Sequence, residues 1–265
     1  FLNEAQGYIK RHKDESFFLY YSLQQPHVPR TPNSRFVGST NLGPRGDVIV
    51  EADWMIGQLI ETLKSEGLLS KTLIIFSSDN GPVVNDGYYD DSEEKLGNHK
   101  PSGVLRGGKY SLFEAGTRVP FFSYWKDIIK PGVSDAMISQ LDLFSSIAAL
   151  VNSKERAEDS EQLIDLLMGK SKNGRNEMVI EATSRTAFRK GDWVMIPPYQ
   201  GPEVNRLVNI ELGNSEIYQL YNLKEDIKQQ KNLAKTNSKK LKELITDFET
   251  IRGKENTNIE QLELK

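Results

Sequence analysis

The sequence contains no cysteine among its 265 residues, and this absence excludes several kinds of chemistry. Disulfide bonds, zinc sites built from thiolates and a cysteine nucleophile cannot form within these residues. Histidine is almost as scarce, because His12, His27 and His99 are the three that occur. The lack of cysteine does not by itself assign a cellular compartment.

A dominant charge is also lacking. The 34 basic and 37 acidic residues are mixed along the chain and give a formal net charge of −3, so no basic face for nucleic acid is present. No stretch approaches the roughly 20 consecutive apolar residues of a membrane span, and no leader of charged and then apolar residues stands at Phe1. We therefore expect no nucleic-acid partner and no membrane span.

Apolar residues make up 37% of the chain, enough to bury the core of one large domain, alone or with a small appendage. The chain opens at Phe1 and, after one or two amphipathic turns, runs into an apolar segment at 17–23. We therefore expect further residues upstream of Phe1.

The first part of the chain predicts a β–α–β unit. The aromatic run FFLYYSL at 17–23 is typical of a buried strand, and 73–78 is a second apolar strand. Between them, 46–66 has the spacing of an amphipathic helix and precedes Gly67, a residue type common just past helix ends. The apolar residues of this helix recur at steps of three and four: Val48, Ala52, Met55, Ile56, Leu59 and Leu63. Such a crossover implies parallel strands.

Open parallel sheets bind ligands beyond the carboxyl ends of their strands, and His27 and Asp79 both follow such expected ends. A further strand is expected at 119–124 and a core-facing helix at 139–151. Residues 1–170 are therefore expected to form an α/β domain, with a mostly parallel or mixed sheet and flanking helices.

The pattern changes after the polar stretch 152–176. Short strands punctuated by proline and glycine follow, which is typical of an antiparallel sheet. They are 178–182, 193–196 and 217–222. A helix is expected at 236–251, with a polar tail that frays. Residues 171–265 are thus expected to form a small antiparallel sheet with a helix.

His27 is the first candidate for a functional site. It lies between Pro26 and Pro29, which restrict the backbone on both sides and limit how far the imidazole can move. A rigid position just past a strand suits a site histidine. The alternative, a loop histidine with a structural hydrogen bond, is the ordinary role of a lone histidine.

The second candidate is the pair Asp79 and Asn80, at the end of the 73–78 strand. A carboxylate and an amide oxygen are hard donors that suit Ca²⁺ or Mg²⁺. The same residues, followed by Gly81 and Pro82, are also good turn formers. Since Ca²⁺ takes roughly 6–8 oxygens, two residues are too few for a complete site.

The third candidate is the segment GVLRGGKY at 103–110, which matches the Gly-x-x-x-x-Gly-Lys half of a P-loop. Tyr110 stands where that loop has serine or threonine, and the polar stretch 92–102 precedes it in place of a buried strand. Nucleotide binding is therefore disfavoured. What remains is a glycine hinge carrying Lys109, whose ammonium can donate to a tetrahedral oxyanion. A solvated surface lysine is the alternative.

Together these segments resemble the formylglycine-dependent sulfatases of the alkaline-phosphatase-like superfamily. His27-Val28-Pro29 is similar to the family's His-x-Pro, and 78–81 (SDNG) to its metal-binding Ser-Asp-Asn-Gly. The segment 105–120 (LRGGKYSLFEAGTRVP) is similar to its Gly-Gly-Lys…Glu-x-Gly-x-Arg-Val-Pro segment. Residues 191–193 and 218–234 resemble its C-terminal subdomain. The resemblance covers nearly the whole chain.

The same resemblance shows what this sequence lacks. The family's pair of adjacent aspartate ligands, a further lysine and histidine, and the Cys/Ser-x-Pro/Ala-x-Arg motif that becomes formylglycine all lie upstream of the His-x-Pro strand. Residues 184–189 (SRTAFR) come nearest to the nucleophile motif but have the wrong spacing. We therefore expect the chain to be the C-terminal part of a larger sulfatase, with 1–170 belonging to its catalytic domain.

The resemblance implies a sulfuric ester hydrolase acting on a sulfated glycan or aryl substrate, with Ca²⁺ rather than Mg²⁺ and a formylglycine upstream of this chain. It implies that Asp79 and Asn80 supply half of the metal shell. It also implies that Lys109 contacts the sulfate or the leaving oxygen and that His27 orients or protonates at the ester oxygen. His99 is then either a substrate contact or a plain loop histidine. An exported enzyme, periplasmic or extracellular, is implied as well.

Two other functions stay open: a phosphoester hydrolase of the same superfamily, and a non-catalytic glycan-binding relative. The isolated chain is expected to show no turnover and to bind metal weakly, because two ligands leave most of a Ca²⁺ shell to water. Its uncovered apolar edges are expected to associate with the missing N-terminal portion or with a second copy.

Overall fold

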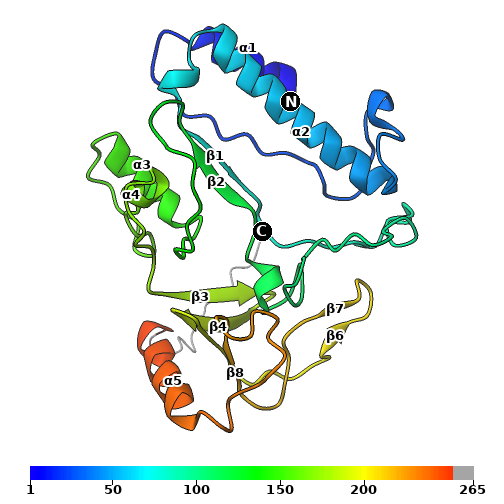
Figure 1. The fold of residues 1–265 in the computed structure, drawn as a ribbon, viewed down its shortest axis with the longest axis vertical. Helices are drawn as coiled ribbons and strands as arrows, with labels where there is room; N and C mark the ends of the chain where they lie inside the picture. The colour runs from blue at the N-terminus through cyan, green and yellow to red at the C-terminus, as the bar shows by residue number, and fades with distance from the viewer. Residues whose placement is uncertain (253–265) are drawn as a thin grey trace, which may run out of the picture.

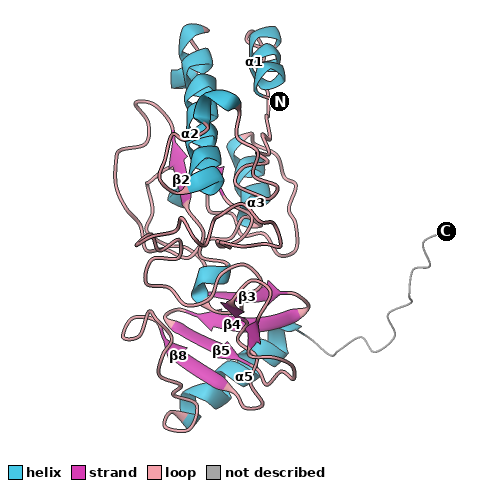
Figure 2. Cartoon of the chain, turned by 90° about the vertical axis from the view of Figure 1, so that its right-hand side faces the viewer, coloured by secondary structure: helices cyan, strands magenta, loops and turns pink. Residues whose placement is uncertain are grey.

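The computed structural model describes residues 1–252 and shows two parts stacked on each other (Figure 2). The upper part in Figure 1 holds a two-stranded sheet with helices α1 (Leu2–Arg11), α2 (Gly43–Ser65) and α3 (Asp142–Leu150), and the short α4 (Ile164–Leu167) lies beside α3. The lower part holds a four-stranded sheet and helix α5 (Ser238–Arg252). The predicted α/β class is confirmed.

Helix α2 confirms the helix predicted over 46–66 and begins at Gly43. It ends as predicted, because Gly67 takes a left-handed backbone conformation with φ +70°. The helix α1 packs against it through a small apolar cluster. The buried members of that cluster are Ile9, Leu63 and Leu68.

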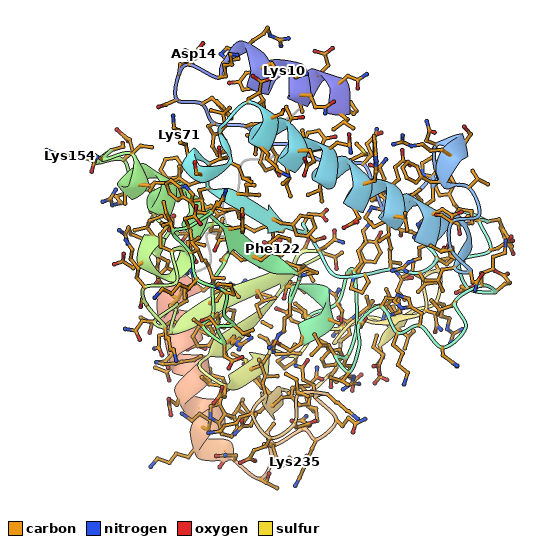
Figure 3. All side chains as sticks on the ribbon, turned by 45° about the horizontal axis from the view of Figure 1, so that its top comes forward. Lys10, Asp14, Lys71, Phe122, Lys154 and Lys235 are labelled. Carbon is orange, nitrogen blue, oxygen red and sulfur yellow. The ribbon has the colours of Figure 1, made fainter. Side chains whose placement is uncertain are left out.

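Strands β1 (Ile74–Ser77) and β2 (Phe121–Tyr124) confirm the strands predicted at 73–78 and 119–124. They pair with each other, and the pairing is antiparallel. The ring of Phe122, labelled in Figure 3, stacks on that of Phe76 with 4.8 Å between centroids. In Figure 1 this sheet lies between α2 and α3.

The predicted β–α–β unit with parallel strands is wrong for this chain. The run 17–23 is not a strand, and it has no sheet neighbour among the described residues. Phe17 and Leu19 pack on the apolar cluster between α1 and α2, whereas Phe18 and Tyr20 are 68% and 81% exposed. A strand needs a neighbour to pair its backbone polar groups, and strand-forming residues alone do not supply one.

The lower part confirms the predicted antiparallel sheet with a helix. Its strand order is β3-β4-β5-β8 and all three pairings are antiparallel. The strands are β3 (Glu177–Ala182), β4 (Arg185–Lys190), β5 (Trp193–Ile196) and β8 (Gln219–Asn222). The sequence did not predict β4, because basic residues surround its two fully buried side chains, Ala187 and Phe188. Long basic side chains can lie along a sheet with their charges in water, which hides the apolar alternation.

This sheet is covered on both faces. One face packs on α5, and its buried side chains are Phe188, Met195 and Leu220 with Leu244 and Phe248 of the helix. The other face has Ala187, Val194, Ile196 and Tyr221, which pack on Leu112 and Phe113. Because Leu112 and Phe113 follow Lys109 in the chain, the segment that carries the candidate lysine is built into the core of the lower part.

The remaining elements of residues 1–252 are short. They are α4 (Ile164–Leu167), β6 (Val204–Asn205) paired with β7 (Ile210–Glu211), and 3-10 turns at Ser34–Phe36, Leu69–Lys71 and Glu114–Gly116. None of the described helices combines the length and the apolar character needed to cross a membrane. The tail that the sequence predicts to fray lies outside the described residues.

Candidate active site

The glycine loop, residues 103–116, lies directly against the end of the β1 strand. The backbone N–H of Lys109 donates to the carbonyl of Pro82 at 2.9 Å. Gly81 has no room for a side chain, because a Cβ there would lie 1.6 Å from the carbonyl oxygen of Ala115. The glycines of both segments therefore allow backbone to approach backbone, which brings Lys109 next to the Asp79-Asn80 turn.

Two arginines, one from the loop and one from β4, anchor this loop to the lower part of the molecule. Arg106 makes a two-pronged ion pair with Glu211, both N–O distances being 2.8 Å, and this bond raises the pKa of Arg106. Arg185 of β4 donates to the carbonyl of Tyr110 at 3.0 Å. That bond holds a non-glycine residue in the left-handed region, since φ of Tyr110 is +76°.

A buried carboxylate provides a third anchor. The Glu114 side chain is 3% exposed and accepts from Arg189 of β4 at 3.2 Å and from Arg118 of the same segment at 3.5 Å. The Glu114 N–H donates to the buried Gln229 side chain at 2.7 Å. The position of the loop is therefore fixed by the four-stranded sheet.

At the tip of this loop Lys109 and Asp86 form the centre of a polar cluster. The Lys109 ammonium donates to Asp86 Oδ2 at 2.7 Å, and the Tyr110 hydroxyl donates to Asp86 Oδ1 at 2.9 Å. The Nε2 atom of His27 lies 3.2 Å from Lys109 Nζ. The lysine and aspartate side chains are 14% and 10% exposed, whereas that of His27 is 63% exposed.

The contacts within this cluster keep Asp86 and Lys109 charged. Burial alone would raise the pKa of Asp86, but the hydrogen bonds from Lys109 and Tyr110 outweigh it and the pKa is lowered from 3.8. Burial alone would lower the pKa of Lys109, but the hydrogen bonds and charges of Asp86 and Tyr110 together outweigh it, and the pKa is raised from 10.5. At neutral pH the cluster therefore presents an ammonium held by a carboxylate.

The imidazole of His27 has a defined orientation. Its Nδ1 lies 2.7 Å from the carbonyl oxygen of Val28. A carbonyl only accepts, so Nδ1 carries a hydrogen and donates it. In the neutral imidazole the lone pair of Nε2 therefore faces Lys109, and a proton gained on Nε2 would point into the same space.

Arg30 ties the His27 segment to the Asp86 segment. It donates to the carbonyls of Pro26 at 3.0 Å, Val84 at 2.9 Å and Val83 at 3.3 Å. It also pairs with Asp90 at 2.8 Å, and its side chain is 2% exposed. The two segments that hold His27 and Asp86 are thus fixed by one buried guanidinium.

Asp79 and Asn80 lie just past β1. The Asp79 side chain is exposed, and the Asn80 amide nitrogen donates to the carbonyl of Gly81 at 2.9 Å, which leaves its oxygen free. One carboxylate and one amide oxygen fit part of a Ca²⁺ shell. Within residues 1–252 no group of three or more acidic, histidine or cysteine side chains gathers as a metal site.

A large open hollow brings most of the candidates together. His27, Asp79, Asn80 and Lys109 all line it, as does Asp86. His99 does not line it; the residue is exposed in the turn after Leu96, to whose carbonyl its N–H donates at 3.0 Å. The structure therefore gathers four of the five residues that the sequence singled out.

Two residues of the site, Asp86 and Arg30, carried no sequence signal. Asp86 stands in an Asn-Asp-Gly stretch typical of a turn, and its partner Lys109 is 23 positions further on. Arg30 is one of 34 basic residues, and only its burial distinguishes it. Tyr110 stands where a P-loop has serine or threonine, and in the structure its hydroxyl is the second donor to Asp86.

The model of the family described as Sulfatase matches residues 1–153. The N-acetylgalactosamine-6-O-sulfatase of Bacteroides thetaiotaomicron is 42% identical over 254 residues, which cover 94% of this chain and 50% of that protein. The chain belongs to the sulfatase family. Arylsulfatase A of Homo sapiens is 34% identical over 168 residues, covering 63% of this chain and 31% of that protein.

Solved structures agree with this membership. A sulfatase structure from work on the metabolism of glycosaminoglycans by Bacteroides thetaiotaomicron superposes with a TM-score of 0.92 at 42% identity, over 95% of this chain and 53% of the other. A sulfatase from Pseudoalteromonas sp. shares the fold with a TM-score of 0.76 at 23% identity, over 95% and 51%. The chain thus spans about half the length of these sulfatases, and about a third of arylsulfatase A.

Proposed function

We propose that this chain supplies one side of a sulfatase active site and that the complete enzyme hydrolyses sulfate esters of a glycan. The observation that carries the proposal is the contact between Lys109 and His27 in the hollow that also contains Asp79 and Asn80. In a member of the sulfatase family, this places a permanent cation and a titratable imidazole side by side at one small volume.

Lys109 would bind a sulfate oxygen. Its ammonium has three donors, and two of them already have partners in Asp86 and His27. The carboxylate of Asp86 keeps the lysine protonated and aimed. A sulfate oxygen that approaches the third donor would gain a charge-assisted bond without further ordering of the side chain.

His27 would hold a proton at the ester oxygen. The Val28 carbonyl fixes the hydrogen of Nδ1, so Nε2 is the atom that exchanges a proton with the substrate. Protonated Nε2 cannot accept from Lys109, so gain of that proton frees the lysine donor for a sulfate oxygen. The leaving alcohol would then take the proton from Nε2.

Asp79 and Asn80 would hold Ca²⁺, rather than Mg²⁺, with further ligands from outside this chain. When bound, the ion would neutralise negative charge on the sulfate oxygens. A formylglycine, also from outside this chain, would supply the nucleophile. The Asp79 and Asn80 oxygens need only face the hollow beside Lys109, and both residues line it.

The substrate class and location extend this proposal. The similarity to an N-acetylgalactosamine-6-O-sulfatase supports a sulfated amino-sugar glycan as substrate, and a glycan-degrading sulfatase suits an exported enzyme. We also retain the division into 1–170, part of the catalytic domain, and 171–265, a small α+β subdomain. His99 would contact substrate only at the edge of the site, because it lies outside the hollow.

The test joins this chain to the first half of the Bacteroides thetaiotaomicron relative, matured to carry formylglycine, and measures release of sulfate from 6-sulfated N-acetylgalactosamine. We expect turnover, and we expect Lys109→Ala to lower kcat/KM by at least about 100-fold, equivalent to about 2.7 kcal/mol. The exposed Lys126→Ala is the matched control and should retain activity. Absence of sulfate release from the properly matured, folded protein contradicts the proposal.

A further inference from the structure

One further cationic side chain that lines the same hollow has no assigned partner. Arg45, near the start of α2, lines the hollow and is 6% exposed. Its Nη1 atom is buried and makes no hydrogen bond with any described residue. A buried guanidinium without a partner is rare, because the loss of water around a charge is costly unless another group replaces it.

Orphan polar atoms are concentrated in this hollow. Within residues 1–252, the buried side-chain polar atoms without a partner belong to Tyr21, Arg45 and Gln229. Tyr21 and Arg45 both line the hollow, whereas Gln229 belongs to the lower part. Buried polar groups are otherwise paired in folded proteins, so the orphan guanidinium nitrogen of Arg45 points to a group that completes it.

The charges around Arg45 do not balance within the described chain. Arg30 and Asp90 are the charged neighbours that act on it, the first repelling and the second attracting. Asp90 is already bound to Arg30 at 2.8 Å. One carboxylate thus faces two guanidiniums, and burial together with Arg30 lowers the pKa of Arg45.

Other nearby charges do not supply the missing anion. Asp47 is buried, but its carboxylate accepts from the backbone N–H groups of Gly38 and Thr40 at 2.8 and 2.9 Å. The Asp91 carboxylate pairs with Lys95 at 2.8 Å on the surface. The first turn of α2 contains no acidic residue and has no side-chain cap, so the positive end of the helix adds to the field.

We propose that Arg45, with Arg30 behind it, forms an oxyanion subsite that binds a second acidic group of the glycan whose sulfate ester reaches Lys109. A carboxylate or sulfate on the neighbouring sugar is the chemistry that fits a guanidinium fork. This inference rests on the proposed function, since it takes the hollow to be the substrate site. It adds that the substrate is an acidic oligosaccharide and not a monosaccharide.

The position of Arg45 favours a glycan over an acidic side chain of another polypeptide. Arg30, its neighbour, holds the segments of His27 and Asp86, so Arg45 is connected to the polar end of the hollow. A protein surface would be expected on the apolar residues that line the hollow, such as Phe17, Leu19 and Ile74. An oligosaccharide bound in this hollow has both Lys109 and Arg45 among the residues that line its site.

The experiment compares two sugars by calorimetry with the 265-residue chain: 6-sulfated N-acetylgalactosamine alone, and the same sugar linked to glucuronate. We expect Arg45→Met to weaken binding of the disaccharide at least tenfold, or about 1.4 kcal/mol, and to leave the monosaccharide unchanged. Arg45→Lys should fall between Arg45→Met and the unchanged chain, because it keeps the charge and loses the fork. Arg206→Met, at an exposed arginine of the lower part, should change neither affinity.

Thermal unfolding without sugar provides the second readout. Arg45→Met should unfold at the same temperature as the unchanged chain or higher, because it removes an unpaired buried charge. A lower unfolding temperature would show that Arg45 has a structural partner and would overturn the subsite. Equal loss of affinity for both sugars, or for neither, would also overturn it.

A further arm tests the competing source of the anion. The first half of the Bacteroides thetaiotaomicron relative is added as a separate polypeptide. If it stabilises the unchanged chain but not Arg45→Met, and the disaccharide is not preferred, the guanidinium pairs with a protein carboxylate and the proposal fails. These readouts measure binding and stability, so they are independent of whether sulfate is released.

Discussion

The two parts of the molecule differ in how completely they bury their own apolar residues. In the lower part both faces of the four-stranded sheet are covered, and Phe188, Met195 and Leu220 are 0% exposed. In the upper part the two-stranded sheet is only half-buried, and Phe122 is 53% exposed even though its ring stacks on Phe76. Tyr20 on the 17–23 run is 81% exposed.

The difference shows which part carries its own stability. A sheet with covered faces gains the full benefit of apolar burial, at roughly 25 cal/mol per Å² removed from water. The upper part leaves an apolar surface of the kind that marks an interaction site. The glycine loop connects the two, because its Leu112 and Phe113 are buried in the lower core while Lys109 lies in the upper hollow.

The largest expected effect is on the lower core. Phe188→Ala should lower the free energy of unfolding by about 4 kcal/mol, because it leaves a cavity between the sheet and α5. Phe122→Ala removes the same ring from a half-exposed site and should cost less than about 1.5 kcal/mol. Urea denaturation followed by circular dichroism checks both. Equal losses in the two variants would remove the contrast between the parts.

Hydrogen exchange should show the same contrast without mutation. Amides of β5, which has a paired strand on each side, should exchange at least about 100-fold more slowly than those of β1, equivalent to about 2.7 kcal/mol. The measurement is mass spectrometry of peptides after exchange in heavy water. Similar rates would mean that the chain opens as one unit.

Gly81→Ala should destabilise the contact between the parts by about 2 to 3 kcal/mol. A methyl group there would lie 1.6 Å from the Ala115 carbonyl, so the glycine loop would have to move away. The control is Gly67→Ala, which meets no atom within 4 Å and carries only the strain of φ +70°, about 1 kcal/mol. Thermal unfolding of both variants distinguishes a steric cause from a conformational one.

The smallest effect expected is at the Lys109–Asp86 pair, where Asp86→Asn should cost about 1 kcal/mol at pH 7. The pKa of Asp86 is lowered from 3.8 in the folded chain, so its contribution is present above that value and is lost as the pH falls below it. The difference in unfolding free energy between Asp86→Asn and the unchanged chain should therefore shrink between pH 5 and pH 2. The exposed Asp91→Asn serves as control, and a constant difference would show that Asp86 is not an ionised partner.

Much of the local structure was predictable. The helix of 46–66, its end at Gly67 and the strands at 73–78 and 119–124 follow from periodicity and glycine placement, which act over a few neighbours. The β4 strand was not predictable, because basic residues flank its two buried side chains. The parallel crossover failed for a different reason, since the 17–23 run has the composition of a strand and lacks a neighbour.

The site was predictable in its residue types and not in its contacts. His27 and Lys109 were chosen for rigid and glycine-rich surroundings, yet 82 positions separate them and only the fold places Nε2 and Nζ 3.2 Å apart. Asp86, the carboxylate that binds Lys109, stands in an Asn-Asp-Gly stretch typical of a turn. No pattern in the sequence singles out Arg30 or Arg45, because burial alone distinguishes them from surface arginines.

The sequence by itself determined the helix of 46–66, the strands at 73–78 and 119–124, the chemical groups available and the glycines that allow close backbone approach. These features depend on neighbouring residues, whose periodicity and φ preferences are local. Only the tertiary structure decided that β1 pairs with β2, that the lower sheet anchors the loop of Lys109, and that Arg45 is buried without an anion. Those outcomes depend on which groups distant in the sequence come into contact and on how much water each contact excludes. Neither can be predicted from a short segment of the sequence.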